Sequence, residues 1–190
     1  MDRVPDATRW HGADGEILFI GRLDVEHKGL DLLVRAVAAL PPGALPVVRI
    51  LGPDQRGGRA QLTALISSLG VQDRVVVGDA IYGQSKWDAI AGSRAFVYPS
   101  RWEGFGNAPA EAAAIGVPTL VTPYPLGDYL AGAGAAIVAP ATVEGLAEGL
   151  QAIVSHEGAR CGPIAADLVT REFTWEAVAR AWLTQLEAWA

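Results

Sequence analysis

The chain has 190 residues, of which 51% are hydrophobic and 19% are charged, and its 15 Lys and Arg against 21 Asp and Glu give a formal net charge of -6. This composition excludes an intrinsically disordered chain and indicates one globular domain with a substantial core. The acidic balance, with only two lysines, leaves no basic surface for nucleic acid or an anionic membrane. The single cysteine excludes an internal disulfide, and no stretch has the apolar length of a signal peptide or a transmembrane segment, so we expect a cytoplasmic protein.

Short apolar runs bounded by Gly, Pro or Asp alternate along the chain with segments of helical period. The predicted strands are 16–21, 46–52, 74–78, 94–100, 118–123 and 135–140, and the predicted helices between them are 28–40, 59–70, 85–92, 108–116 and 143–155. This alternation indicates stacked βαβ units, whose right-handed crossovers place helices on both faces of the sheet. Strands buried on both faces are expected to be this apolar. The sequence therefore predicts an α/β fold with a doubly wound, parallel, Rossmann-like sheet of about six strands.

The two ends of the chain differ from this pattern. Residues 1–15 form a polar lead, and two helices are expected after position 156, near 159–169 and over 174–190, where Thr174 is the expected N-cap. Three tryptophans of the last helix fall seven residues apart and so line one stripe of it: Trp175, Trp182 and Trp189. We expect this stripe to pack on the domain's own sheet, and docking on another domain is the alternative.

The loop after the first predicted strand carries two cations. Arg22 follows Gly21 at the strand end, and Lys28 lies at the start of the next helix. Because a cation is unfavourable at a helix N-terminus, Lys28 calls for an anion between it and the helix amides. A diphosphate would meet this need, with Arg22 binding it bidentately. Taken alone, the loop favours the simpler interpretation of surface salt bridges with its acidic neighbours, Asp24, Glu26 and Asp31.

The loop after the fourth predicted strand is rich in glycine and carries two carboxylates. Gly104 and Gly106 begin a G-x-G-x-x-G pattern, but Pro109 stands where the third small residue belongs. The dinucleotide fingerprint therefore fails, which disfavours a dehydrogenase. The loop amides and the following helix N-terminus can still bind phosphate or sugar oxygens. Glu103 and Glu111 can border the same crevice, where each carboxylate could accept hydroxyl hydrogen bonds from a polyhydroxylated ligand.

Three segments in order, GRLDVEHKGLDLL, PSRWEGFGNAPAEAAAIGVP and FTWEAVARAWLTQLE, resemble the retaining GT-B glycosyltransferases of group 1, also called family 4. The likeness covers nearly the whole chain, and its most specific element is the E-x7-E pattern from Glu103 to Glu111. It implies that Glu111 holds the ribose of a UDP-, GDP- or ADP-sugar donor and that Glu103 contacts the donor sugar. Arg22 and Lys28 would bind the diphosphate. The complete donor-binding set that it implies is Gly21, Arg22, Lys28, Ile81, Glu103, Gly104, Phe105, Gly106, Asn107 and Glu111.

The resemblance also implies a reaction, the transfer of a hexosyl group to a hydroxyl of a sugar, lipid or other acceptor, with retention of configuration. Arg22, Lys28 and Glu103 would be catalytic, and no metal or cofactor is expected, because the cations stabilise the leaving diphosphate and the sequence has no Asp-x-Asp. Members of this family have two Rossmann-like domains, and this chain resembles only the donor-binding half, 16–173, followed by the helix 174–190.

The acceptor-binding N-terminal domain, or a separate partner subunit, is then expected to complete the enzyme, and the isolated domain is expected to be inactive. The alternative is a non-catalytic module that binds a nucleotide or nucleotide sugar and acts with a partner protein. A purely structural domain is disfavoured, because two cations and two glutamates lie together in loops at strand ends.

Overall fold

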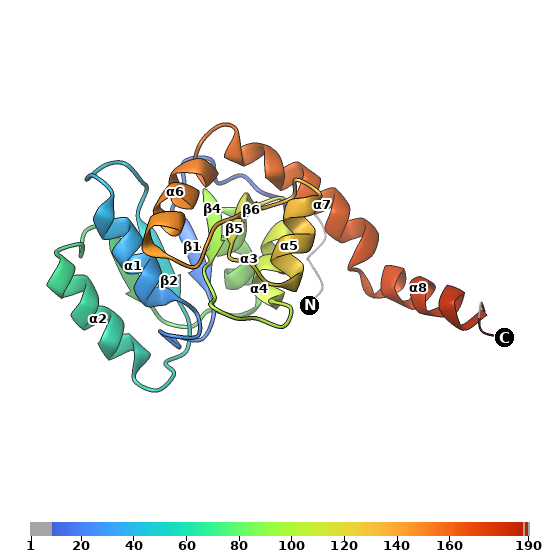
Figure 1. The fold of residues 1–190 in the computed structure, drawn as a ribbon, viewed down its shortest axis with the longest axis horizontal. Helices are drawn as coiled ribbons and strands as arrows, with labels where there is room; N and C mark the ends of the chain where they lie inside the picture. The colour runs from blue at the N-terminus through green and yellow to red at the C-terminus, as the bar shows by residue number, and fades with distance from the viewer. Residues whose placement is uncertain (1–8, 188, 190) are drawn as a thin grey trace.

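One parallel sheet organises the fold, seen in a computed structural model that describes residues 9–187 and 189 (Figure 1). Within these residues six strands stand in the order β3-β2-β1-β4-β5-β6, and all neighbours are parallel. The strands are β1 (Ile17–Ile20), β2 (Val48–Leu51), β3 (Val75–Gly78), β4 (Ala95–Tyr98), β5 (Thr119–Val121) and β6 (Ile137–Val138). Each strand lies inside the range predicted for it, so the doubly wound Rossmann-like sheet is confirmed.

Helices connect successive strands and follow the last one. They are α1 (Leu30–Ala39), α2 (Gly58–Leu69), α3 (Gly83–Ala91), α4 (Asn107–Ala114), α5 (Pro125–Gly132), α6 (Val143–Ile153), a 3-10 turn at Gly158–Arg160, α7 (Cys161–Glu172) and α8 (Trp175–Glu187). The sequence did not predict α5, because its eight residues include a proline and two glycines. The proline stands in the first turn, where a missing N–H is tolerated, so it does not break the helix.

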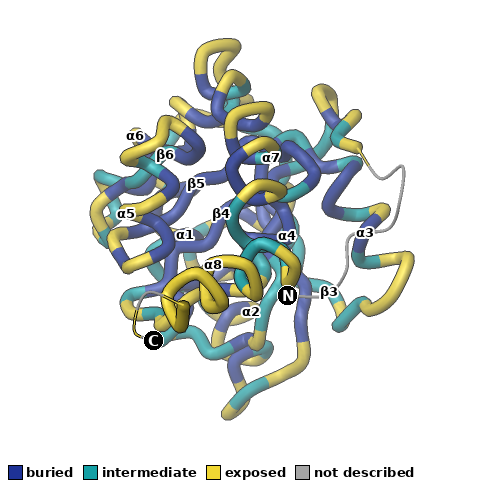
Figure 2. Tube along the Cα trace, turned by 90° about the vertical axis from the view of Figure 1, so that its right-hand side faces the viewer, coloured by how far each residue is buried: buried dark blue, intermediate teal, exposed yellow. Residues whose placement is uncertain are grey.

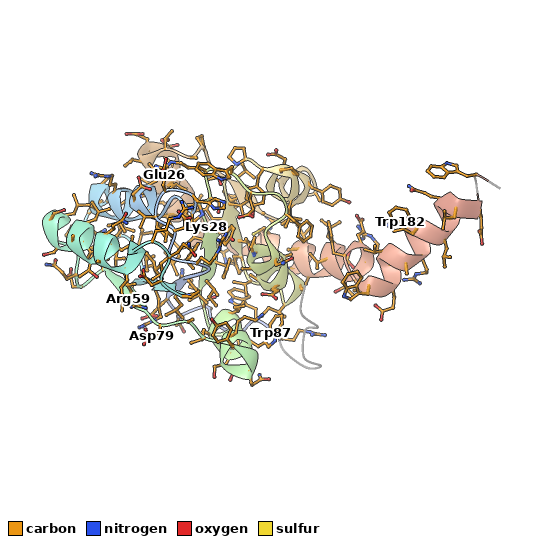
Figure 3. All side chains as sticks on the ribbon, turned by 90° about the horizontal axis from the view of Figure 1, so that it is seen from below. Glu26, Lys28, Arg59, Asp79, Trp87 and Trp182 are labelled. Atoms are coloured by element: carbon orange, nitrogen blue, oxygen red, sulfur yellow. The ribbon has the colours of Figure 1, made fainter. Side chains whose placement is uncertain are left out.

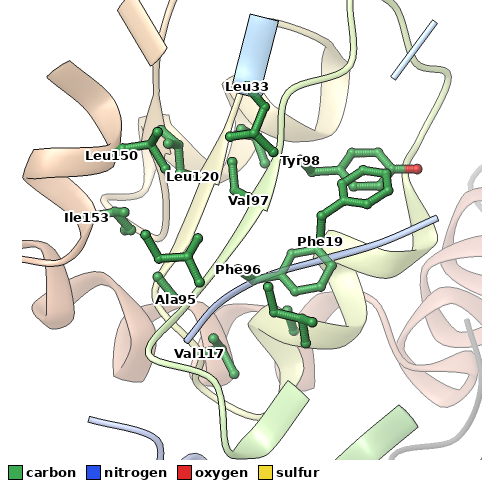
Figure 4. Close-up of a cluster of buried hydrophobic side chains, with 14 of the residues drawn as sticks. Phe19, Leu33, Ala95, Phe96, Val97, Tyr98, Val117, Leu120, Leu150 and Ile153 are labelled. Atoms are coloured by element: carbon green, nitrogen blue, oxygen red, sulfur yellow. The ribbon is translucent and has the colours of Figure 1, made fainter. Parts of the chain in front are cut away.

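The helices form a layer on each face of the sheet (Figures 1 and 2). On one face α1 contacts both α2 and α6, and on the other α4 contacts α7. The core contains the fully buried rings of Phe19 and Phe96 together with aliphatic side chains of the strands and of α1 and α6 (Figure 4). Burial on both faces removes any need for polar residues along the strands, which accounts for their unbroken apolar runs.

Part of the N-terminal lead is anchored to the sheet domain. Trp10 and His11 donate backbone hydrogen bonds to the carbonyls of Ile115 and Ala91, at 3.0 Å each. The Trp10 indole donates to the Ser93 carbonyl at 2.7 Å. The part of the predicted lead over 1–8 lies outside the described residues. The described remainder therefore packs beside the start of β4.

The last helix, α8, extends away from the rest of the fold (Figure 1). Thr174 caps it as predicted, since its hydroxyl accepts a hydrogen bond from the Ala177 amide at 3.1 Å. The expected packing of the tryptophan stripe on the sheet is wrong: Trp175, Trp182 and Trp189 are 75%, 62% and 82% exposed, and α8 has no buried residue (Figures 2 and 3). The two helix layers already cover both faces of the sheet, so no face is left for α8. Among the described residues, no helix combines the length and apolar character needed to cross a bilayer.

Candidate functional site

A cleft opens where the strand order reverses. From β1 the chain continues to β2 on one side, whereas β4, the other neighbour of β1, continues to β5 on the opposite side. The loops after these two strands therefore diverge and leave a crevice at their carboxyl ends. The cleft has a volume of about 450 Å³. Its lining consists of Ile20, Gly21, Arg22, Lys28, Tyr98, Glu103, Phe105, Gly106, Asn107, Ala108 and Glu111.

Eight of the ten predicted donor-binding residues line this cleft. The two that do not are Gly104, which is exposed in the glycine-rich loop, and Ile81, which is half-buried against the core. The structure thus brings together the cations of the first loop and the carboxylates of the fourth, which are more than seventy residues apart in sequence.

Lys28 reaches the cleft because of the glycine that follows it. Gly29 has a φ of +61°, and a Cβ built on it would lie 2.1 Å from the Pro99 carbonyl oxygen. Only glycine permits both this backbone conformation and this close approach of the α1 N-terminus to the end of β4. The approach buries Lys28 to 4% exposure and turns it toward the centre of the fold (Figure 3).

The ammonium group of Lys28 is held by two residues of β4 and its loop. Its Nζ donates to the Tyr98 hydroxyl at 2.9 Å and to Glu103 Oε2 at 2.5 Å. The favoured interpretation of the sequence, a surface salt bridge within the first loop, is therefore wrong for Lys28. Tyr98 was not among the predicted residues, because it reads as one more apolar residue of a buried strand. Burial raises the pKa of its phenol above the ordinary value, and Lys28 opposes that shift.

The first loop and the start of α1 are bound to the glycine-rich loop by contacts that do not involve Lys28. Asp31 forms a bidentate pair with Arg101, with N···O distances of 2.7 and 2.8 Å, and Arg101 also donates to the Glu26 carbonyl. The His27 ring stacks on Trp102, with centroids 5.0 Å apart. These contacts fasten the first loop to the glycine-rich loop. Arg22 is exposed in the cleft, and within the described part of the chain it forms no ion pair, so its guanidinium is available to an anionic ligand.

The glycine-rich loop leads into α4 with its N-terminus at the cleft. Gly106 is the N-cap, with a φ of 85° that disfavours other residues. Asn107 and Ala108, in the first turn of α4, both line the cleft. The amides of a helix N-terminus carry partial positive charge, so this turn adds to the field of Arg22 and Lys28.

Glu111 lies one turn further along α4 and forms a buried ion pair. It is 5% exposed, and its Oε1 accepts a hydrogen bond from Lys86 Nζ at 2.9 Å. Lys86 was missed by the sequence reasoning, although it stands in the first turn of α3, the same unfavourable place for a cation that drew attention to Lys28. That signal could have identified it.

The loop after β3 borders the same edge of the sheet. Arg59 of α2 donates to the Gly78 carbonyl and to Asp79, both at 2.9 Å, and the two labelled side chains lie together in Figure 3. These bonds fix the loop that leads to Ile81, whose place in the donor-binding set stays a prediction. Among residues 9–187 and 189 no group of three or more His, Cys, Asp or Glu side chains is arranged to hold a metal ion.

The profile of the glycosyl transferases group 1 family matches residues 2–166. The chain belongs to this family. Relatives include the lipopolysaccharide core biosynthesis mannosyltransferase LpsB of Rhizobium meliloti (strain 1021), 35% identical over 125 residues that cover 62% of this chain and 34% of the relative. Mannosylfructose-phosphate synthase of Agrobacterium fabrum (strain C58 / ATCC 33970) is 33% identical over 132 residues, or 63% of this chain and 29% of the relative.

Solved glycosyltransferase structures share the fold. Sucrose-phosphate synthase from Thermosynechococcus elongatus superposes with a TM-score of 0.77 at 25% identity and covers 95% of this chain and 47% of its own. Anabaena Alr3699/HepE, solved with UDP and glucose, gives a TM-score of 0.78 at 19% identity, over 93% of this chain and 49% of its own. The group 1 chain thus spans about a third of the length of these curated relatives and about half that of the solved structures. The resemblance to a domain of the GT-B glycosyltransferases is confirmed.

Proposed function

We propose that this chain binds the nucleotide-diphosphate-sugar donor as the C-terminal half of a retaining, metal-independent glycosyltransferase. The observation that carries the proposal is the cleft itself, in which Arg22, buried Lys28 and the α4 N-terminus face two glutamates. Such a cleft combines the cationic groups that suit a diphosphate with the carboxylates that suit hydroxyl groups.

The positive groups would act on the leaving group. When the bond from the sugar to the diphosphate breaks, negative charge grows on the departing phosphate and positive charge grows on the sugar ring. Lys28 is held beside the cleft by Tyr98 and the α4 amides by their helix, so both are positioned to stabilise that charge, and exposed Arg22 can join them. Because these groups already supply the positive charge, the transfer of a hexosyl group to an acceptor hydroxyl needs no divalent metal.

The two glutamates would orient the donor. Glu111 is buried at the α4 end of the cleft and would accept hydrogen bonds from the ribose hydroxyls, with Lys86 holding its carboxylate in place. Glu103 lies between Lys28 and the glycine-rich loop, where it would contact the donor sugar. The acceptor site is proposed to lie on an N-terminal domain or a partner subunit.

Calorimetric titration of the chain with UDP, GDP and ADP in the presence of EDTA tests the donor site. We expect one of the three to bind without metal, and Arg22→Ala to weaken it while leaving the melting temperature unchanged. UDP is tested first, since Alr3699/HepE was solved with UDP. Binding that appears only when Mg²⁺ is added would refute metal independence, and no binding in either buffer would refute the donor site.

A second measurement separates the enzyme from a non-catalytic module. The chain is mixed with candidate acceptor domains and the nucleotide sugar whose diphosphate it binds, and nucleotide release is followed. Transfer that requires the added domain supports the half-enzyme. Persistent binding with no transfer by any combination supports the alternative, a nucleotide-sugar binding module that acts with a partner protein.

A further inference from the structure

One buried hydroxyl beside the cleft has no partner. Among the side chains of the described residues, Tyr124 Oη is the only buried polar atom without a hydrogen bond, and the residue is 4% exposed. A buried hydroxyl without a hydrogen bond destabilises the folded protein, because it has lost its bonds to water. Such a group in a native fold therefore suggests a role outside stability. Tyr124 is not among the residues that line the cleft.

The hydroxyl lies directly behind the glycine-rich loop. Tyr124 follows β5, and the Thr122 hydroxyl donates to the Ser100 carbonyl, which ties the ends of β4 and β5 together. A single point beside Gly106, where a Cβ would stand, is 3.3 Å from Tyr124 Oη and 3.5 Å from Glu103 Cγ. The phenol and the glutamate side chain therefore both border the same point beside Gly106.

Glu103 pairs with Lys28 in this structure, at 2.5 Å, and its other neighbours are the Ser100 hydroxyl, 3.5 Å from Oε2, and the Tyr98 hydroxyl, which also accepts from Lys28. A diphosphate in the cleft would compete for the same ammonium group and would repel the carboxylate as a like charge. Glu103 would then lose its shortest hydrogen bond, and a further donor close by would stabilise its carboxylate. Burial, and after it the neighbouring Tyr98 and Glu103, raise the pKa of Tyr124, so its phenol keeps the proton that it would donate.

We propose that Tyr124 is a positioning residue, whose hydroxyl donates a hydrogen bond to Glu103 when a nucleoside diphosphate or its sugar conjugate takes Lys28. In the unliganded protein Lys28 holds Glu103, and in the liganded protein Tyr124 holds it. The exchange keeps the Glu103 carboxylate fixed beside the donor sugar after Lys28 has turned to the phosphates. This inference rests on the proposed donor site and adds to it a residue outside the cleft.

Tyr124→Phe tests the exchange, because it removes the hydroxyl and keeps the ring. We expect the variant without ligand to melt at or above the temperature of the wild-type chain, since no hydrogen bond is lost. Its affinity for the tightest-binding of UDP, GDP and ADP should fall about tenfold, as for one hydrogen bond to a charged acceptor. Tyr129→Phe is the matched control, since it removes an exposed hydroxyl that bonds to Glu172 and does not line the cleft. It should leave affinity unchanged.

A double-mutant cycle with Glu103→Ala measures whether the effect of Tyr124→Phe on affinity depends on Glu103. A merely structural role of Tyr124 would give no such dependence. In the Glu103→Ala background, Tyr124→Phe should change the affinity less than twofold, because the acceptor of its hydrogen bond is gone. An equal tenfold loss in both backgrounds would overturn the inference, and so would a lower melting temperature for unliganded Tyr124→Phe. If the wild-type chain binds a diphosphate and Tyr124→Phe binds it equally well, only this inference fails. If the wild-type chain binds none, the proposed function fails first.

Discussion

Gly106 is the position at which one added methyl group should disturb the site most. Its φ of 85° is unfavourable for any residue with a Cβ, at a cost of about 1–2 kcal/mol. The Cβ would also stand 3.0 Å from Pro109 Cγ and 3.3 Å from Tyr124 Oη, and such overpacking costs about 1–3 kcal/mol. Alanine restricts the unfolded chain, which returns about 0.4–1 kcal/mol. Gly106→Ala should therefore lower the free energy of unfolding by about 1–5 kcal/mol.

Substitutions at two other glycines separate the backbone strain at Gly106 from the steric contacts of the added Cβ. Gly104, two residues away, has no positive φ and nothing within 4 Å of its Cβ position, so Gly104→Ala should be neutral or slightly stabilising. Gly43 has a φ of +80° with open space around it, so Gly43→Ala measures the backbone strain alone. Urea unfolding of the three variants gives the comparison. In a thermal scan, the melting temperature of Gly106→Ala should fall by about 3–15 °C. If Gly106→Ala and Gly104→Ala agree within about 0.5 kcal/mol, the account of the loop is wrong.

Three further substitutions test the contacts that hold the site. Lys28→Met removes the partner of Glu103, so urea unfolding should show a loss of about 1–3 kcal/mol. It should also weaken a diphosphate more than the corresponding nucleoside, and equal losses in calorimetry would place Lys28 away from the phosphates. Glu111→Ala should weaken the nucleotide by about 1.5–3 kcal/mol, and an unchanged affinity would remove Glu111 from the site. Burial raises the pKa of Asp31, but its hydrogen bond and charge interaction with Arg101 outweigh burial and hold that pKa below the ordinary value. A carboxyl whose pKa is lowered by folding stabilises the protein at pH values above its pKa in the unfolded chain, about 3.9. This stabilisation is lost as the pH falls through its pKa in the folded protein. Asp31→Asn should therefore lower the melting temperature at pH 7 and have much less effect in acid below both pKa values, whereas equal losses at both pH values would contradict the pairing.

Much of the fold could be predicted because its causes are local. Each strand is a short apolar run because both of its faces are covered, and each helix shows the period of a segment with one buried face. The E-x7-E spacing placed Glu103 in a loop and Glu111 on the following helix, and both were found at the cleft. The α5 segment escaped prediction because its residue types favour a turn, and only its packing against β6 selects the helix.

The prediction for α8 failed for a different reason. An amphipathic stripe shows that one face of a helix avoids water but does not say which surface covers it. The sheet was already covered by α1, α2 and α6 on one face and by α4 and α7 on the other, and competition among helices for the same sheet cannot be read from any one of them.

By itself the sequence determined the alternation of elements, the parallel sheet and the presence of two cations and two carboxylates in the segments that follow two of the strands. Hydrophobic period and loop composition are local properties, so they can be read from a segment without knowing which other segments it packs against. Only the tertiary structure decided that Lys28 pairs with Glu103 and Lys86 with Glu111, and that Tyr124 lies unpartnered behind Gly106. The Lys28–Glu103 pair exists because β1 stands next to β4, and Tyr124 lies behind Gly106 because β4 stands next to β5; that order arises from the packing of the whole sheet rather than from any segment of it.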